Sequence, residues 1–348
     1  MGMRAFIIRR LLLTIPILLG AVLLVFAVTQ LFDPFQRVSL YASDITKISQ
    51  ADIQSLIQQY GLNDPVYLQF FHWIQQLLKG NLGVSRTARQ PVVEALVSRF
   101  PATAEVVLLS APLIIFIGIW LGIQSALHRD KIIDHITRAS SIVGYSLPSF
   151  WLGILLISIF SVMLNLTPPP GRVDTSVFLY TEMYNTGYVK YTGLYTIDGI
   201  LNGQLWITQN ALGHLVLPVT VLISIQIALI VRIMRSSMLE ALNKGYIVTA
   251  KAKGLPKKEV INKHARRNAL IPTVTLSGLL IAGMLNGVVI TETIFGLNGV
   301  GQFAANAALN IDIAAVLGFT LFSGMIFIFA NLLVDISYAF LDPRIRLE

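Results

Sequence analysis

The chain has 348 residues, of which 55% are apolar and only 13% are charged, and its mean hydropathy is +0.70. Soluble domains carry about 25% charged residues, so this composition excludes an ordinary soluble protein and indicates a polytopic membrane protein. The chain contains no cysteine, which excludes disulfides, zinc thiolates and cysteine nucleophiles. The formal net charge is +8, and the distribution of the basic residues is more informative than this sum.

Six apolar segments are long enough to cross a membrane, because a spanning helix needs about 20 mostly apolar residues. The predicted spans are residues 11–31, 102–127, 139–165, 212–234, 269–291 and 314–340. The first span follows a basic start, MGMRAFIIRR, which is also typical of a signal peptide. Its apolar run exceeds the roughly 7–15 residues of a signal peptide, and no clear cleavage site follows, so we expect this span to be retained.

The basic residues predict the orientation of these spans. If the N-terminus is cytoplasmic, the cytoplasmic segments hold 18 of the 26 Lys and Arg, and the extracytoplasmic segments hold 8. Cytoplasmic loops carry an excess of Lys and Arg, so both termini are expected in the cytoplasm. Asp335 lies within the last span, near its cytoplasmic end, and we expect a structural ion pair with Arg232 or Arg235 rather than a transport role.

Two of the predicted extracytoplasmic segments are long. We divide the chain into residues 1–101, which hold the first span and an extracytoplasmic helical region, and residues 102–348, the core membrane domain. Within the first region, DPVYLQFFHWIQQLLKG places Val66, Phe70, Trp73, Ile74 and Leu77 on one apolar helix face. The second segment, residues 166–211, gathers five tyrosines, which suit an interface with lipid or with protein: Tyr180, Tyr184, Tyr188, Tyr191 and Tyr195.

Motifs for catalysis are missing from this sequence. It contains no G-x-x-x-x-G-K-[ST] phosphate loop and no H-E-x-x-H zinc motif, and its five histidines are scattered. The glycine-rich GLNGVG at residues 296–301 does not follow a predicted strand, so we expect no nucleotide site there. We therefore predict no catalytic residue, no metal site and no cofactor in this chain, which argues against a membrane-embedded enzyme.

The loop between the fourth and fifth spans, residues 235–268, is rich in Lys and Arg. Helix-compatible sequence continues to Lys253; Gly254 is typical of a helix C-terminus in the left-handed conformation, and Pro256 of the first turn of a new helix. Tyr246, Ala250 and Gly254 recur at i, i+4 and i+8, so small residues would permit close approach of a partner. Anionic lipid would also bind such charge, but needs no small residues. Nucleic acid is disfavoured because no aromatic residues are interleaved with the charge.

This loop resembles the "EAA"-type loop of permease subunits in binding-protein-dependent ABC importers. The similar stretches include RSSMLEALNKGYIVTAKAKGLPKKEVINKHARRNALIP, ITETIFGLNGVGQFAANAALNIDI and, upstream, GLNDPVYLQFFHWIQQLLKGNLGVS. More narrowly, nearly the whole chain is similar to the first of the two permeases of dipeptide/oligopeptide importers. It departs from the family at LFDPFQ, where a Pro-Gly-Asp-Pro turn is frequent, and in the longer 168–206 segment.

The resemblance implies an all-α permease in a prokaryotic inner membrane, with a second homologous permease, two ABC ATPase subunits and an extracytoplasmic binding protein as partners. ATP and Mg²⁺ would bind to the ATPases, which would contact a coupling helix formed by Tyr246, Thr249, Ala250, Ala252, Gly254 and Leu255. Glu292 and Phe295 are candidates for contact with solute or binding protein. Related permeases serve peptides, nickel complexes or oligosaccharides. An autonomous secondary transporter is the alternative, although intramembrane charge is scarce and no paired broken spans are evident.

Overall fold

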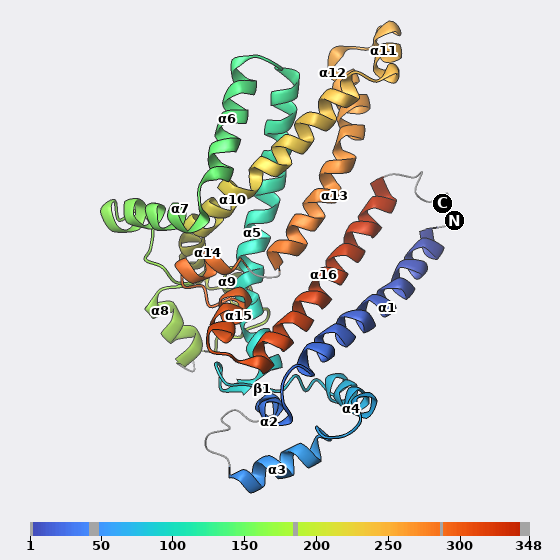
Figure 1. Cartoon of the computed structure of the whole chain (residues 1–348). Helices are drawn as coiled ribbons and strands as arrows, with labels where there is room; N and C mark the ends of the chain where they lie inside the picture. The colour runs from blue at the N-terminus through green and yellow to red at the C-terminus, as the bar shows by residue number, and fades with distance from the viewer. Residues whose placement is uncertain (1–2, 42–48, 184–186, 286–287, 342–348) are drawn as a thin grey trace.

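The computed structural model describes residues 3–41, 49–183, 187–285 and 288–341, which form an almost entirely helical protein (Figure 1). Within these residues, five helical segments are long and apolar enough to cross a membrane, and a bent helix pair is a sixth candidate. The five are α1 (Met3–Thr29), α5 (Val92–Leu127), α10 (Leu205–Leu242), Lys257–Leu285 with α13 (Arg266–Leu285), and α16 (Ile313–Leu341). Backbone groups in a bilayer must bond internally, so these apolar runs are helical. The predicted all-α polytopic fold is confirmed.

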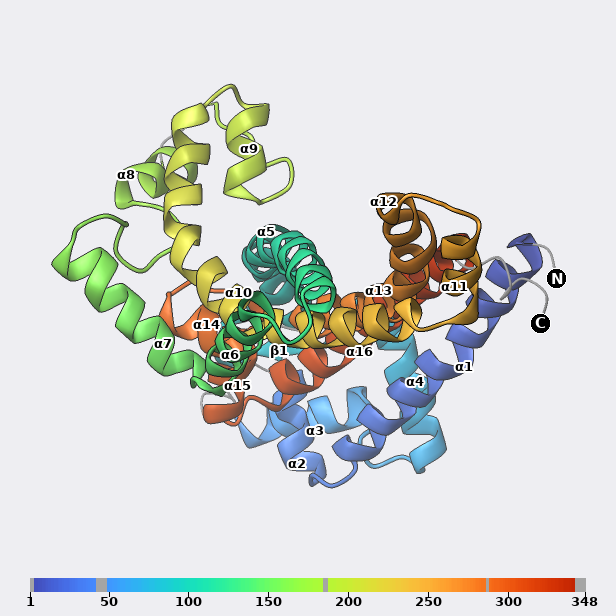
Figure 2. The ribbon, with the colours of Figure 1, turned by 90° about the horizontal axis from the view of Figure 1, so that it is seen from above.

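The predicted third span, residues 139–165, is not one straight helix. It is divided between α6 (Ile132–Ser146) and the segment formed by α7 (Ser149–Leu156) and the π-helical η3 (Ile157–Met163), which are bent by 97°. Proline lacks a backbone N–H and disfavours helical geometry in the preceding residue, and Leu147, before Pro148, is extended. As a result, α7 runs sideways away from the bundle (Figures 1 and 2).

Helices α5 and α10 form the centre of the bundle. They hold 36 and 38 residues and begin upstream of their predicted spans, so each is about 55 Å long, which exceeds the ~30 Å hydrocarbon core. Gly118 and Gly122 of α5 permit the close approach of α10, because a Cβ atom at either position would lie 2.7 Å from Ile230 or Met234. The main apolar core fills this contact and continues onto α13.

The first of the two regions predicted to be extracytoplasmic consists of short elements around the end of α1. These are α2 (Pro34–Arg37), η1 (Val38–Leu40), α3 (Gln50–Gln59), α4 (Val66–Leu78) and a hairpin of β1 (Val84–Ser85) and β2 (Gln90–Pro91). The rings of Phe70 and Trp73 contact Phe26 of α1, as expected for the apolar face of α4. Val66, by contrast, is 57% exposed.

The remaining elements complete the two ends of the molecule. α8 (Thr175–Phe178), the π-helical η4 (Leu179–Met183) and α9 (Tyr195–Leu201) precede α10, while α14 (Val289–Ile294) and α15 (Val300–Leu309) precede α16. The α5–α6 turn and the loop holding α11 (Gly245–Ala252) lie at the upper end of Figure 1, and α2, α3 and α4 at the opposite end. α1 begins, and α16 ends, in the upper half.

Candidate coupling loop and the ion pairs that hold it

The loop after α10 is a compact helical unit rather than a continuation of that helix. α10 ends at Leu242, and α11 begins at Gly245, so the expected continuous helix to Lys253 is interrupted. Gly254 has a φ of +75°, which confirms the left-handed residue predicted there. The Leu255 N–H donates to Ala250 O, and the Gly254 N–H to Lys251 O, which is the hydrogen-bond pattern of a Schellman helix end. A second helical run, beginning with α12 (Lys257–Glu259) and the π-helical η5 (Val260–Ala265), returns into α13.

One face of α11 belongs to the interior of the protein. Ile247 is fully buried and Ala250 is 5% exposed, and both pack in an apolar cluster with Met234 and Met238 of α10 and Val260 of η5. Burying apolar surface in this cluster stabilises the loop against the ends of two spans. The buried face of α11 therefore packs directly against the end of α10 and against η5.

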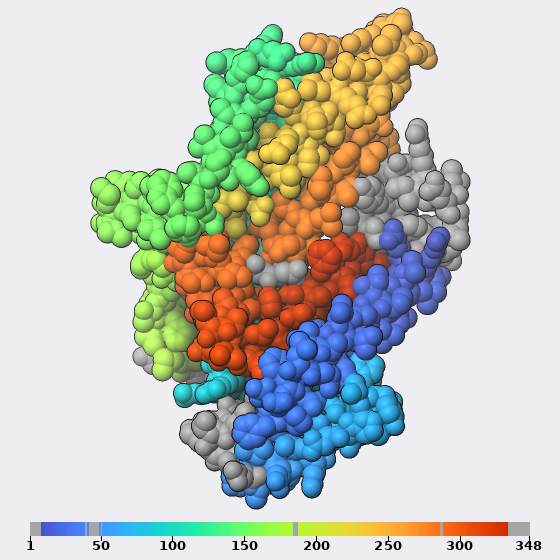
Figure 3. Space-filling view, in the orientation of Figure 1, coloured from blue at the N-terminus to red at the C-terminus, as the bar shows by residue number. Residues whose placement is uncertain are grey.

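The opposite face of α11 is free to contact a partner. Tyr246 and Val248 are 40% and 63% exposed, and Thr249, Ala252 and Gly254 are exposed as well. Figure 3 shows this loop at the extremity of the surface. Four of the six predicted coupling residues are thus exposed, Leu255 is half-buried, and Ala250 is buried. The predicted row of Tyr246, Ala250 and Gly254 requires correction: Ala250 faces inward, since the 3.6-residue period places it beside Ile247.

A buried ion pair links α10, from which this loop projects, to α6. Asp134 of α6 has no exposed surface and accepts hydrogen bonds from Arg235 Nε and Nη2 at 2.8 and 2.7 Å. It also accepts from Ser125 Oγ at 2.5 Å and from the Asp130 N–H at 3.1 Å. Three helices, α5, α6 and α10, are thereby joined near the loop. A bidentate Arg–carboxylate pair fixes the relative orientation of the two side chains as well as the distance between them.

Arg235 therefore has a partner that the sequence analysis did not single out. Asp134 stands among apolar residues in IIDHITR, and an acidic group within such a helix is the signal that could have revealed it. Arg232 is exposed. The side chain of Asp335, the expected partner of one or the other of these arginines, lies outside the described part of the structure.

Glu292 and Phe295 are both interior residues. Glu292 is fully buried and accepts hydrogen bonds from Thr103 Oγ1 at 2.5 Å and from the Gln302 N–H at 2.7 Å, in the first turn of α15. A carboxylate is favourable at a helix N-terminus, although burial raises the pKa of Glu292. Phe295 is 3% exposed within the main apolar core. Neither side chain reaches the outer surface in this conformation, so contact with solute would require the region to open.

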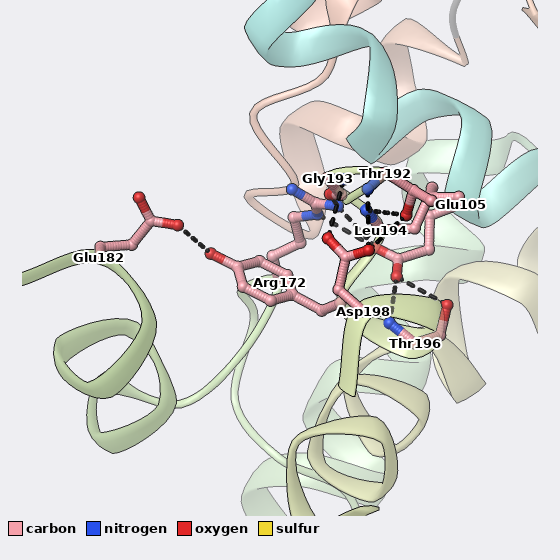
Figure 4. A network of polar contacts seen from close by, with 9 residues as sticks. Glu105, Arg172, Glu182, Thr192, Gly193, Leu194, Thr196 and Asp198 are labelled. Carbon is pink, nitrogen blue, oxygen red and sulfur yellow. Dashed lines mark hydrogen bonds and ion pairs between the residues drawn. The ribbon is translucent and has the colours of Figure 1, made fainter. Parts of the chain in front are cut away.

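A third buried carboxylate, Glu105 of α5, holds the long segment that precedes α10 (Figure 4). It accepts hydrogen bonds from Arg172 Nε and Nη2 at 3.2 and 2.8 Å, and from the Thr196 N–H and Oγ1 at 2.8 and 2.9 Å. Arg172 also donates to Gly193 O at 2.7 Å. Glu105 lies within the predicted span 102–127, and an acidic residue inside an apolar span is the signal that could have revealed it.

The tyrosines of this segment form a small core of their own. Tyr180, Tyr188 and Tyr195 pack with Val177 and Ile207, whereas Tyr191 is 60% exposed and Tyr184 lies outside the described residues. The Tyr195 hydroxyl donates to Glu182 at 3.0 Å, and burial raises the pKa of Tyr195 to about 12. Three of the five tyrosines thus stabilise the segment itself.

We expect Glu105→Gln to lower the free energy of unfolding by about 2–3 kcal/mol, because it leaves the Arg172 charge without its carboxylate. The Glu182–Lys190 pair in the same segment provides the control. Since Lys190 is about half exposed, Glu182→Gln should cost less than about 1 kcal/mol. Thermal unfolding in detergent, with limited proteolysis of residues 168–204, measures both; equal effects of the two substitutions would contradict the prediction.

A largely apolar groove of about 390 Å³ lies between α10 and α13. Among the described residues, Gln226 is the only polar side chain in its lining, and the other residues are Leu229, Leu276, Leu279, Leu280, Gly283, Met284 and Val288. Among the residues that the structure describes, no cluster of His, Asp or Glu could hold a metal ion. The groove offers a surface for apolar contact or for passage, with few groups that could bind a solute tightly.

The bundle of apolar helices long enough to span a bilayer defines a multi-pass membrane protein, and a short helical loop projects from one end of this bundle. The chain belongs to the family described as "Binding-protein-dependent transport system inner membrane component", whose model matches residues 114–347. It is 40% identical over 344 residues to the dipeptide transport system permease protein DppB of Escherichia coli K12, covering 99% of both chains. It is 36% identical over 345 residues to the oligopeptide transport system permease protein AppB of Bacillus subtilis, covering 99% of this chain and all of the relative. The di/tripeptide permease of Pseudomonas aeruginosa is 38% identical over 344 residues, with 99% of both chains covered.

Proposed function

We propose that this chain is a permease subunit of an ATP-driven importer that carries peptides, or a similar small solute, across a prokaryotic inner membrane. The observation that carries the proposal is the similarity to peptide permeases along 99% of the chain. Solute is delivered by an extracytoplasmic binding protein, and a second, homologous permease completes the path. ATP and Mg²⁺ bind to two partner ATPases, so hydrolysis takes place outside this chain.

Coupling proceeds through the two faces of α11. The exposed face, with Tyr246, Thr249 and Ala252, seats in a groove of an ATPase, where small side chains permit close packing. The buried face, with Ile247 and Ala250, transmits the motion to α10 and η5. A rigid loop suits this role, because force on a flexible loop would be lost in local rearrangement.

The groove between α10 and α13 contributes to the solute path opposite the second permease. The described part of its lining offers one amide, Gln226, and no charged side chain. Conduction requires that a solute be held weakly enough to leave again. Such a surface discriminates little between peptides with different side chains, so the binding protein selects the solute.

In the proposed orientation, α11 lies in the cytoplasm together with both termini. Lys251, Lys253, Lys257 and Lys258 are exposed around the loop, and Arg129 and Lys131 lie at the α5–α6 turn, at the same end of the molecule. Positive charge is retained on the cytoplasmic side of a bilayer. The regions built on α2–α4 and on α8–α9 are then extracytoplasmic and face the binding protein.

Affinity purification of the tagged chain from its native membranes tests the proposal. We expect a second permease and two ATPase subunits to copurify, and peptide uptake into vesicles to require both the binding protein and internal ATP. Uptake driven by an ion gradient with the chain alone would support the secondary transporter instead and would refute the proposal.

A further inference from the structure

A polar cavity of about 240 Å³ lies at the outer end of α1, between that helix, the α2–η1 segment and α4. Its lining includes Phe26, Thr29, Gln30, Arg37, Tyr41 and Trp73. Phe26 and Thr29 belong to the apolar stretch Ile8–Thr29 of the first span. The cavity therefore lies at the depth where this span leaves the hydrocarbon core, which is the level of lipid headgroups.

The buried guanidinium of Arg37 lies in the wall of the cavity, and one of its N–H groups has no hydrogen-bond partner. Arg37 is 7% exposed; its Nη1 donates to Gln69 Oε1 at 2.5 Å and Gln30 Oε1 at 3.1 Å, and its Nη2 to Leu62 O at 3.1 Å. Its Nε is buried and has no hydrogen-bond partner. All three acceptors are neutral oxygens, and among the described residues no carboxylate forms an ion pair with Arg37.

Within the part of the chain that the structure describes, no carboxylate is bonded directly to Arg37, and the only carboxylate that acts on it electrostatically is that of Asp33. A guanidinium has five N–H donors and remains charged in proteins, and an unpaired buried charge is costly. Burial lowers the pKa of Arg37, which reflects this cost. Gln30 and Gln69 hold the guanidinium in place, so the side chain is positioned before any ligand arrives. A bound oxyanion would supply the missing negative charge and further acceptors.

The side chains around the cavity are of the types found at the level of lipid headgroups. Tyr41 and Tyr60 are stacked with ring centroids 3.7 Å apart and form part of the lining, together with His72 and several glutamine side chains. On α4, Tyr67 and Phe71 are 72% and 58% exposed. Aromatic rings on an amphipathic helix at the end of a span are typical of the membrane–water interface.

We propose that this cavity binds the phosphate group of a phospholipid headgroup, with Arg37 as its principal donor. The planar guanidinium matches phosphate oxygens through parallel N–H bonds, and the tyrosine and amide groups provide additional polar contacts. The lipid joins α1 to α3 and α4 and so fastens the first extracytoplasmic region to the membrane surface. This site is separate from the coupling loop and from the solute path.

Native mass spectrometry of the full-length protein, with any subunits that remain bound, tests this proposal. The protein is delipidated in detergent and titrated with phosphatidylglycerol, or with inorganic phosphate alone. We expect one tightly retained lipid per chain, with retention reduced about tenfold in Arg37→Lys, which keeps the charge but loses the planar fork. Gln59→Trp should cause a similar loss, because Gln59 is an exposed residue of the lining and a large ring there obstructs the cavity.

Arg86→Lys is the matched control, since Arg86 is an exposed arginine of the same extracytoplasmic region. It should retain lipid as the unmodified protein does. If Arg37→Lys does not fold, Gln59→Trp still decides, because it leaves the contacts of Arg37 intact. If excess inorganic phosphate does not displace the lipid, the ligand is a phospholipid headgroup, as proposed. If inorganic phosphate alone displaces the lipid, the assignment to a lipid headgroup is overturned. Equal retention in all four proteins overturns the site itself.

Discussion

Replacing Ala252 with aspartate is expected to reduce ATP-driven uptake by at least about tenfold while the permease remains folded in the membrane. Ala252 is exposed on the outward face of α11, so the new carboxylate meets no group of this chain. In the assembled transporter it would be buried against the ATPase, and an unpaired charge at a close-packed contact costs several kcal/mol. Uptake into vesicles and copurification of the ATPase measure this loss.

Two further variants separate coupling from folding. Ala250→Asp places the same charge in the apolar cluster beneath α11, so it should lower the yield of folded protein as well as uptake. Lys131→Asp changes the charge at the α5–α6 turn, where Lys131 is exposed, and should leave uptake nearly unchanged. Normal uptake with Ala252→Asp, in a protein that melts normally, would contradict docking through this face.

Asp134→Ala is expected to lower the free energy of unfolding by about 3–5 kcal/mol, the usual effect of removing one partner from a buried ion pair. The reason is that Arg235 loses both of its carboxylate bonds while its side chain stays 19% exposed. The contact between α6 and α10 should loosen near the coupling loop, so uptake should decline as well. Chemical or thermal unfolding in detergent provides the measurement.

The double variant Asp134→Leu with Arg235→Met distinguishes charge from packing. Apolar replacement of both partners avoids the unpaired cation, so most of the lost stability should return. Glu240→Gln in α10 removes an exposed ion pair with Lys244, which lies just past the end of that helix, and should have no measurable effect. A single Asp134→Ala variant as stable as the unmodified protein would show that the pair contributes no net stability.

The class of fold could be predicted from the sequence because a bilayer constrains the chain so strongly. Apolar runs of sufficient length must be helical there, and the five long spanning segments were anticipated. The third span was predicted as continuous, although Ser146, Leu147 and Pro148 carry a local signal for a break. The break at Asn243 and Lys244 has no comparably strong signal, since both residues are compatible with a helix.

The sequence also predicted the helical loop after α10, with its turn at Gly254, but it could not assign the faces of α11. Gly254 was predicted correctly because a left-handed helix end depends on local backbone geometry alone. The inward direction of Ala250 depends on Met234 and Val260, which lie on other helices. Spacing along one helix shows which residues share a face, but not which face meets the rest of the protein.

By itself, then, the sequence determined the helical membrane fold, the position of the basic loop and the expected orientation, all of which follow from composition and short-range patterns. Only the tertiary structure decided the pairing of Asp134 with Arg235, the pairing of Glu105 with Arg172, and the burial of Glu292. These carboxylates lie between 67 and 189 residues from partners to which they are bonded. Such pairs depend on which helices become neighbours, and that is settled by the packing of the whole bundle rather than by any local stretch.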